Sequence, residues 1–343
     1  MKQYTSLYFV GAGGIGMSAL VRYFLAKGYK VAGYDRTQSP LTTELKTEGL
    51  EIVYEESVES IPDYCRNPET TLVVYTPAIP ASHAGLVYFR EHGFRVVKRA
   101  ELLGLITQSS KGLCFAGTHG KTTTSSMAAH IFHESPIGCN AFLGGILRNY
   151  NSNLILSEQS PFTVIEADEY DRSFHWLHPY MAVVTATDPD HLDIYGTEEA
   201  YLESFAHFTS LIQPGGCLIM KKGIKLVPSV KENVKIYTYS ARDGGDFHAG
   251  NIRIGDGTIV FDFVMPEGSV ADIELGVPVE INIENAVAAM AIAWLNGVSG
   301  NDMRRAMASF KGAKRRFEFW VRRPDRVMID DYAHHPDELK ASI

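Results

Sequence analysis

The stretch Gly117-Thr118-His119-Gly120-Lys121-Thr122-Thr123-Thr124 decides the fold of this chain. An apolar run over residues 113–116 precedes it, and we expect a helix to begin at about residue 122. A glycine-bearing turn between a strand and a helix, closed by a lysine and hydroxyl side chains, is typical of a phosphate-binding loop. Gly120 frees backbone N–H groups for phosphate, Lys121 can reach the β and γ phosphates, and Thr122 can ligate Mg²⁺. The stretch therefore predicts an α/β unit that binds ATP and Mg²⁺.

One position of this loop departs from the strict pattern GxxxxGK[ST]. That pattern needs a glycine at position 115, where the chain has Phe115. The part of the motif that contacts the β and γ phosphates is nevertheless complete. A flexible polar turn with a chance Gly-Lys-Thr is the alternative. We favour ATP binding because the strand, the glycines, the lysine and the hydroxyls occur together.

Two further polar stretches follow apolar runs in the same unit. Glu166-Ala167-Asp168-Glu169-Tyr170-Asp171 begins at the end of the run 162–166, and Asp188-Pro189-Asp190-His191-Leu192-Asp193 follows the run 181–185. The carboxyl ends of parallel strands face the nucleotide crevice. Mg²⁺ takes one or two carboxylates together with phosphate oxygens and water. We therefore predict metal ligands at Glu166 and His191, with a solvated acidic loop and an ordinary polar surface as the alternatives.

A second glycine loop lies near the N-terminus. Gly11-Ala12-Gly13-Gly14-Ile15-Gly16 fits GxGxxG between an apolar strand over 7–10 and a helical pattern over 17–27. Asp35 ends the next strand, 19 residues after Gly16, where an acid usually meets a ribose hydroxyl. The loop predicts phosphate binding without specifying the nucleotide, and alone it would suggest NAD. The alternative is a tight turn that binds nothing.

Two stretches nearer the C-terminus allow both a structural and a functional interpretation. Asn282-Ile283-Glu284-Asn285 precedes an alanine-rich helical pattern, and Asn is a strong helix N-cap, so capping competes with an adenine contact at Asn285. Arg315-Arg316-Phe317-Glu318 offers Arg316 as a clamp for a γ-phosphate or forms part of a basic face.

The order of strands and helices predicts an α/β protein in three parts. Strands separated by helical segments over residues 1–107 indicate a Rossmann-like, doubly wound parallel sheet. A polar linker over 107–112 leads into a central P-loop-type ATPase domain over 108–321, with a small antiparallel sheet within 246–285. Residues 322–343 begin a further strand and motif, which we expect to be the start of a third domain.

Composition excludes several classes of protein. The formal net charge of −8 over 343 residues argues against a nucleic-acid surface. The four cysteines form no CxxC pair, and no apolar run approaches 18 residues. We expect a cytoplasmic protein with reduced cysteines and neither a nucleic acid nor a membrane as partner. Whether it is a monomer or a homodimer stays open.

These motifs, in this order, resemble the Mur ligase family along essentially the whole chain. The family's ATP loop has the shortened glycine spacing, so Phe115 is no objection, and its first loop holds a UDP-sugar and not NAD. The resemblance implies that a set of residues lines the UDP site: Gly11, Gly13, Gly14, Ile15, Gly16, Met17, Ser18, Asp35, Thr76, Ala78 and Arg99. A second set would bind ATP: Gly117, Thr118, His119, Gly120, Lys121, Thr122, Thr123, Asn285 and Arg316.

The resemblance also implies a reaction. Lys121, Glu166, His191 and Arg316 would be catalytic, with metal at Thr122, Glu166 and His191. ATP would drive amide formation between UDP-N-acetylmuramate and L-alanine through an acyl phosphate, in the synthesis of peptidoglycan precursors for the cell wall. Asp330, Tyr332 and His334 match the opening of the family's third domain, and we expect the chain to be poorly active alone.

Departures from the family pattern keep other functions open. Thr185-Ala186-Thr187 replaces a usual asparagine. Tyr170 replaces a usual serine and is similar to ligases that join whole murein peptides to UDP-N-acetylmuramate, which makes them the alternative. An NAD-dependent oxidoreductase and a nonenzymatic nucleotide-binding module are the alternatives from other classes.

Overall fold

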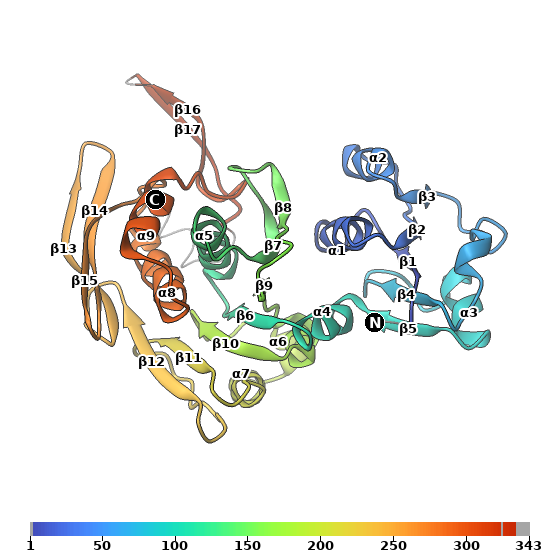
Figure 1. The fold of residues 1–343 in the computed structure, drawn as a ribbon, viewed down its shortest axis with the longest axis horizontal. Helices are drawn as coiled ribbons and strands as arrows, with labels where there is room; N and C mark the ends of the chain where they lie inside the picture. Colours follow the sequence, from blue (N-terminus) through green and yellow to red (C-terminus); the bar gives the residue numbers. More distant parts are fainter. Residues whose placement is uncertain (1–2, 324, 334–343) are drawn as a thin grey trace. The chain divides into compact units, whose positions relative to one another are not determined.

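The computed structural model describes residues 3–323 and 325–333 of the chain. These residues divide into two units, Met1–Ile106 and Thr107–Ile343, each with its own sheet (Figure 1). His334, which the sequence suggests as part of a third-domain motif, lies outside the described residues. The third domain expected over 322–343 therefore stays a prediction.

Unit 1 is a five-stranded parallel sheet in the order β3-β2-β1-β4-β5. Its central strand consists wholly of buried residues, as expected for a parallel sheet covered on both faces. The strand order reverses between β1 and β4, and the carboxyl ends of strands at such a point form a ligand crevice. The strands are β1 Ser6–Val10, β2 Lys30–Tyr34, β3 Glu51–Val53, β4 Thr71–Tyr75 and β5 Arg95–Lys98. The helices are α1 Ile15–Ala26, α2 Pro40–Thr47, α3 Ala84–Glu91 and α4 Arg99–Thr107, with a short 3₁₀ turn, η1 Asp63–Cys65.

Unit 2 contains a ten-stranded mixed sheet in the order β15-β14-β13-β12-β11-β10-β6-β9-β7-β8. The phosphate-loop strand β6 is central and pairs in parallel with β9 and β10. The carboxyl ends of these three strands therefore meet at one edge, where the acidic stretches begin. The strands are β6 Lys111–Ala116, β7 Asn140–Leu147, β8 Ser152–Ile155, β9 Phe162–Glu166, β10 Pro179–Val184, β11 Cys217–Lys221, β12 Lys235–Ser240, β13 Phe247–Gly255, β14 Thr258–Met265 and β15 Gly268–Glu274.

The antiparallel strands that the sequence predicts within 246–285 are present as β13, β14 and β15. They extend the main sheet, because β13 pairs with β12 at Tyr239↔Phe247 and Ser240↔His248. A separate two-stranded antiparallel sheet is formed by β16 Glu318–Arg323 and β17 Arg326–Asp330. The predicted linker over 107–112 is shorter than expected, since Thr107 ends α4 and Lys111 already begins β6.

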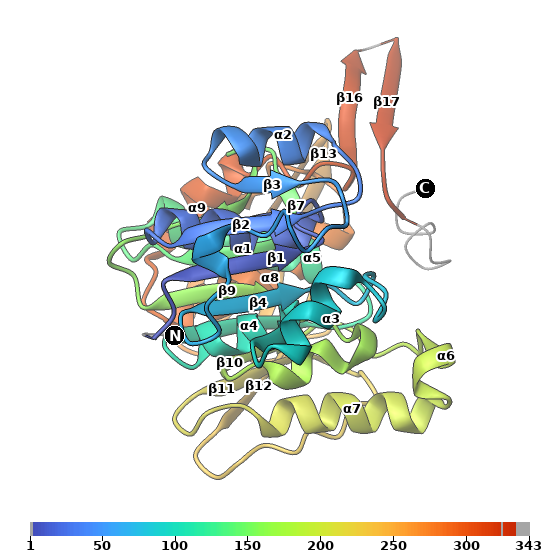
Figure 2. The same cartoon turned by 90° about the vertical axis from the view of Figure 1, so that its right-hand side faces the viewer.

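Helices cover both faces of the unit 2 sheet. α5 Lys121–Glu134, α8 Ile281–Leu295 and α9 Gly300–Ser309 lie on one face, and α7 Glu198–Ser210 lies on the other (Figures 1 and 2). α6 Leu192–Tyr195 and the 3₁₀ segment η2 Tyr170–Trp176 complete the unit.

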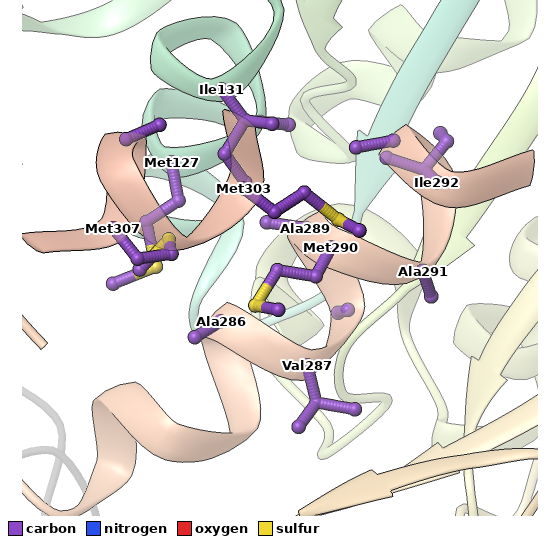
Figure 3. Close-up of a cluster of buried hydrophobic side chains, with 14 of the residues drawn as sticks. Met127, Ile131, Ala286, Val287, Ala289, Met290, Ala291, Ile292, Met303 and Met307 are labelled. Atoms are coloured by element: carbon purple, nitrogen blue, oxygen red, sulfur yellow. The ribbon is translucent and has the colours of Figure 1, made fainter. Parts of the chain in front are cut away.

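The packing of α5 against α8 and α9 fixes the phosphate loop. α8 carries small apolar residues on nearly every side, including Ala286 and Ala289, which marks a buried helix. Small side chains let α5 approach closely, and methionines fill the remaining gaps (Figure 3). Met127 of α5 and Met303 of α9 are at most 1% exposed.

Two findings concern the chain as a whole. All four cysteines are buried free thiols: Cys65, Cys114, Cys139 and Cys217. Among the residues that the structure describes, no helix is long and apolar enough to cross a bilayer.

Candidate active site

The phosphate loop connects β6 to α5, with glycines where the backbone requires them. Gly117 has φ +140° and Gly120 has φ +80°. A Cβ on Gly117 would lie 2.2 Å from Thr185 Oγ1 and 2.8 Å from the Ala186 backbone nitrogen. Because backbone cannot yield as a flexible side chain does, this position requires glycine. The turn delivers the N-terminus of α5, beginning at Lys121, to the carboxyl edge of the sheet.

Lys121 is held by an acid that the sequence did not single out. Its Nζ lies 2.8 Å from Oε2 and 2.9 Å from Oε1 of Glu169, and it donates to the Gly117 carbonyl at 2.5 Å. Glu169 is only 2% exposed. Burial raises the pKa of its carboxyl above the ordinary value, and the Lys121 ammonium opposes that rise.

Thr122 and Glu166 meet as a pair at the end of β9. The Thr122 hydroxyl donates to Glu166 Oε1 at 3.1 Å, and the Gly144 N–H donates to Glu166 Oε2, also at 3.1 Å. A hydroxyl and a carboxylate next to a phosphate loop suit Mg²⁺, which takes its other ligands from phosphates and water. A Cβ on Gly144 would lie 2.4 Å from Glu166 Oε2, so this glycine makes room for the carboxylate.

His191 lies beside a different acid. Its backbone has φ +53°, and its Nε2 lies 3.9 Å from Glu169 Oε1 and 3.8 Å from Asp190 Oδ2. The Tyr170 ring meets the imidazole edge-on with centroids 5.2 Å apart. Within residues 3–323 and 325–333, no three His, Cys, Asp or Glu side chains form a group that could hold a metal ion by themselves. The metal ligands therefore remain a proposal.

A cavity of about 360 Å³ opens beside the loop. Its apolar wall includes Tyr239, Val277 and Phe310, while Asn285 and Arg316 supply polar groups. The lining also carries charged side chains such as Lys221 and Glu284, so the cavity joins an apolar wall to polar groups, as ligand sites do.

Asn285 lies inside α8, which begins at Ile281. The helix-capping interpretation of the Asn282–Asn285 stretch is therefore wrong. The Asn285 side chain accepts a hydrogen bond from the Thr124 hydroxyl and donates to Asn282 Oδ1, each at 3.1 Å. These contacts tie the cavity wall to the phosphate loop.

Arg316 lines the same cavity on a segment that is fastened to the β7–β8 turn. Its guanidinium lies 5.5 Å from the centroid of the Tyr332 ring. Asn149 donates to the Ser309 carbonyl at 2.9 Å and accepts from the Lys311 N–H at 2.8 Å. Sequence reasoning missed this anchor, because the bonded residues are 160 and 162 positions apart.

Thr185 opens the Thr185-Ala186-Thr187 stretch, in which the family's usual asparagine is replaced. Its hydroxyl hydrogen-bonds the carbonyls of Ala116 and His119, at the two ends of the phosphate loop. The Thr185 side chain therefore links the two ends of the loop.

The glycine loop of unit 1 is braced by Asp35. The Gly13 N–H donates to Asp35 Oδ2 at 2.7 Å, so this carboxylate orders the loop itself. A Cβ on Gly11 would lie 2.7 Å from Thr76 Cγ2, and one on Gly16 would lie 2.6 Å from Arg99 Nη1. The structure thus brings the predicted residues Thr76 and Arg99 to the loop.

Other predicted residues of unit 1 differ in their exposure. The Met17 and Ser18 side chains are buried in α1, whereas Ile15 and Ala78 are exposed. Gly14 caps α1 with its backbone.

Comparisons with known proteins agree with this geometry. The models described as the Mur ligase middle domain and as the Mur ligase family catalytic domain match residues 115–293 and 6–111. The UDP-N-acetylmuramate–L-alanine ligase of Parabacteroides distasonis is 65% identical over 343 residues, which is 100% of this chain and 74% of that protein. The chain therefore belongs to the Mur ligase family.

Solved structures show the same relationship. The UDP-N-acetylmuramate-alanine ligase of Thermotoga maritima superposes with a TM-score of 0.82 at 25% identity, over 98% of this chain and 76% of that one. A murein peptide ligase of Psychrobacter arcticus superposes with a TM-score of 0.77 at 25% identity, over 98% of this chain and 75% of that one. The predicted α/β fold with parallel sheets is confirmed.

Proposed function

We propose that this chain carries the UDP-sugar and ATP sites of a ligase that joins L-alanine to UDP-N-acetylmuramate, a step of peptidoglycan precursor synthesis. The observation that carries the proposal is the assembly of the phosphate loop, the Thr122–Glu166 pair and an apolar cavity at one sheet edge. The 65% identity to a protein named for this reaction supports the choice of substrates.

The proposed reaction has two steps. The carboxylate of UDP-N-acetylmuramate attacks the γ-phosphorus of ATP, the bond to the ADP oxygen breaks, and an acyl phosphate forms. The amine of L-alanine then attacks the acyl carbon, a C–N bond replaces the C–O bond, and phosphate leaves as the amine gives up a proton.

The residues of unit 2 supply what the first step needs. Two anions must approach, so positive charge has to offset their repulsion and the charge that spreads over the phosphoryl oxygens. Lys121 and Arg316 supply that charge. Thr122 and Glu166 would hold Mg²⁺, which would supply further positive charge to the phosphates. Asn285 and the cavity wall would fix the adenine, so that the γ-phosphate is correctly oriented.

A ligase for murein peptides is the second candidate. Tyr170, at a position where the family usually has serine, favours it. The two candidates use the same UDP-sugar and differ in the amine that enters, so only the added group separates them.

Calorimetric titration tests the proposed function. The chain should bind UDP-N-acetylmuramate and ATP saturably and should not bind NAD. Binding of NAD and not of the UDP-sugar would refute the assignment of the first loop. Incubation with ATP, UDP-N-acetylmuramate and either L-alanine or a murein tripeptide, followed by mass spectrometry of the product, then distinguishes the two candidates.

A further inference from the structure

Every N–H of the Lys121 ammonium has an acceptor in this structure. A lysine ammonium has three N–H donors. The carbonyls of Gly117 and Thr118 lie 2.5 and 3.4 Å from Nζ, and the carboxylate of Glu169 lies 2.8 Å away. A phosphate oxygen can therefore bind Lys121 only by replacing one of these acceptors.

Glu169 cannot easily follow Lys121 toward a phosphate, because its backbone is fixed. The Glu169 carbonyl accepts hydrogen bonds from the Arg172 N–H at 2.9 Å and from the Tyr195 hydroxyl. Asp171 and Arg172 both have positive φ, which makes a tight turn directly after Glu169. The Arg172 guanidinium also lies over the Tyr195 ring, at 4.8 Å. The backbone that carries the carboxylate is thus held in one place.

The surroundings make the Lys121–Glu169 pair strong. The side chains are 14% and 2% exposed, so water screens the two charges little. Loss of Lys121 from this contact leaves a buried carboxylate without its partner, which is costly. A phosphate drawn to Lys121 also approaches the negative charge of Glu169.

We infer that Glu169 is a positioning residue that competes with the nucleotide phosphates for Lys121 and so limits the affinity of the loop for ATP. This inference rests on the proposed function, because it takes the loop to be an ATP site. It assigns Glu169 a role separate from that of Glu166, whose carboxylate contacts Thr122 and Gly144.

Three variants distinguish the effect of the Glu169–Lys121 contact from the general effect of a negative charge near the loop. Glu169→Gln removes the charge and weakens the contact. Glu169→Asp keeps the charge but shortens the side chain by one methylene. Because it retains a carboxylate, it still tests the contact if the Glu169→Gln variant does not fold. Asp193→Asn is the matched control, since it removes the same charge from an exposed residue of α6, which follows the neighbouring strand β10. ATP binding is measured by calorimetry in EDTA, which removes any metal effect.

We expect Glu169→Gln to bind ATP about tenfold more tightly and Glu169→Asp about threefold, the size of effect that one weakened charge-assisted hydrogen bond produces. Asp193→Asn should change affinity by less than either. Affinity that is unchanged or weaker in folded Glu169 variants would overturn the inference, as would equal tightening in Asp193→Asn. Failure of the unchanged chain to bind ATP would instead refute the proposed function.

Discussion

Acid should destabilise unit 2 through one buried histidine of the phosphate-loop helix. His130 lies on α5 and is 1% exposed. Its Nδ1 lies 2.6 Å from the Tyr150 hydroxyl and its Nε2 lies 2.9 Å from Ser309 Oγ. Burial lowers the pKa of His130 from 6.5 to about 4, opposed by the Glu134 charge.

The sign of the effect follows from proton uptake. Between pH 6.5 and 4 the unfolded chain takes up a proton at His130 that the folded chain does not. The contribution of neutral His130 to the free energy of unfolding is therefore fully present above pH 6.5 and is lost as the pH falls toward 4. The full difference between these pKa values corresponds to about 3 kcal/mol, of which about 2 kcal/mol should be lost between pH 7 and pH 5. The His130→Gln variant should not show this loss between pH 7 and pH 5, whatever its free energy of unfolding at pH 7.

Tryptophan fluorescence isolates the unit concerned, because Trp176, Trp294 and Trp320 all belong to unit 2. Urea unfolding at pH 7 and pH 5 gives the free energy of unfolding for each protein. His133→Gln is the matched control, since His133 lies on the same helix but is exposed. Equal losses of stability on acidification in the unchanged chain and in His130→Gln would refute the reasoning.

Three further predictions concern ligand binding by calorimetry. Lys121→Ala should weaken ATP binding by at least about tenfold, since it removes a charged hydrogen-bond donor, while UDP-N-acetylmuramate binding is retained; unchanged ATP affinity would contradict this. Gly144→Ala should displace the Glu166 carboxylate and lower the Mg²⁺-dependent part of ATP affinity about tenfold, as loss of groups that orient a metal ligand does; the same loss in EDTA would point to general damage to the loop. Asp35→Ala should weaken UDP-N-acetylmuramate binding about tenfold by freeing the Gly13 N–H, without affecting ATP; full UDP-sugar affinity would show that the brace is dispensable.

The strands and loops around both sites were predictable because their signals are local. Buried parallel strands appear as apolar runs; the predicted run 162–166 coincides with β9, and the predicted strand over 7–10 lies within β1. The glycine spacing of both loops is local too, and each loop falls between a strand and a helix as predicted. The expected helix from about residue 122 begins one residue earlier, at Lys121.

The partners of the site residues could not be predicted, since they are distant in sequence. Glu169 lies 48 positions from Lys121, and only the pairing of β9 with β6 brings the acidic stretch to the lysine. The sequence indicated Glu166 as the best metal ligand of that stretch because it lies closest to the end of the strand, and it gave Glu169 no role of its own. Capping and adenine binding at Asn285 were equally compatible with the residue type, and only the start of α8 at Ile281 excludes the first.

The four buried cysteines make the chain suitable for site-specific labelling. The thiolate is the reactive form, and burial raises the pKa of Cys65 and of Cys217 to about 12 and those of Cys114 and Cys139 further. Maleimide dyes should therefore react slowly with the unchanged protein. One new cysteine on the surface of each unit would then carry a fluorophore pair without background. Energy transfer between the two dyes would follow any movement of the units as nucleotide and UDP-sugar are added.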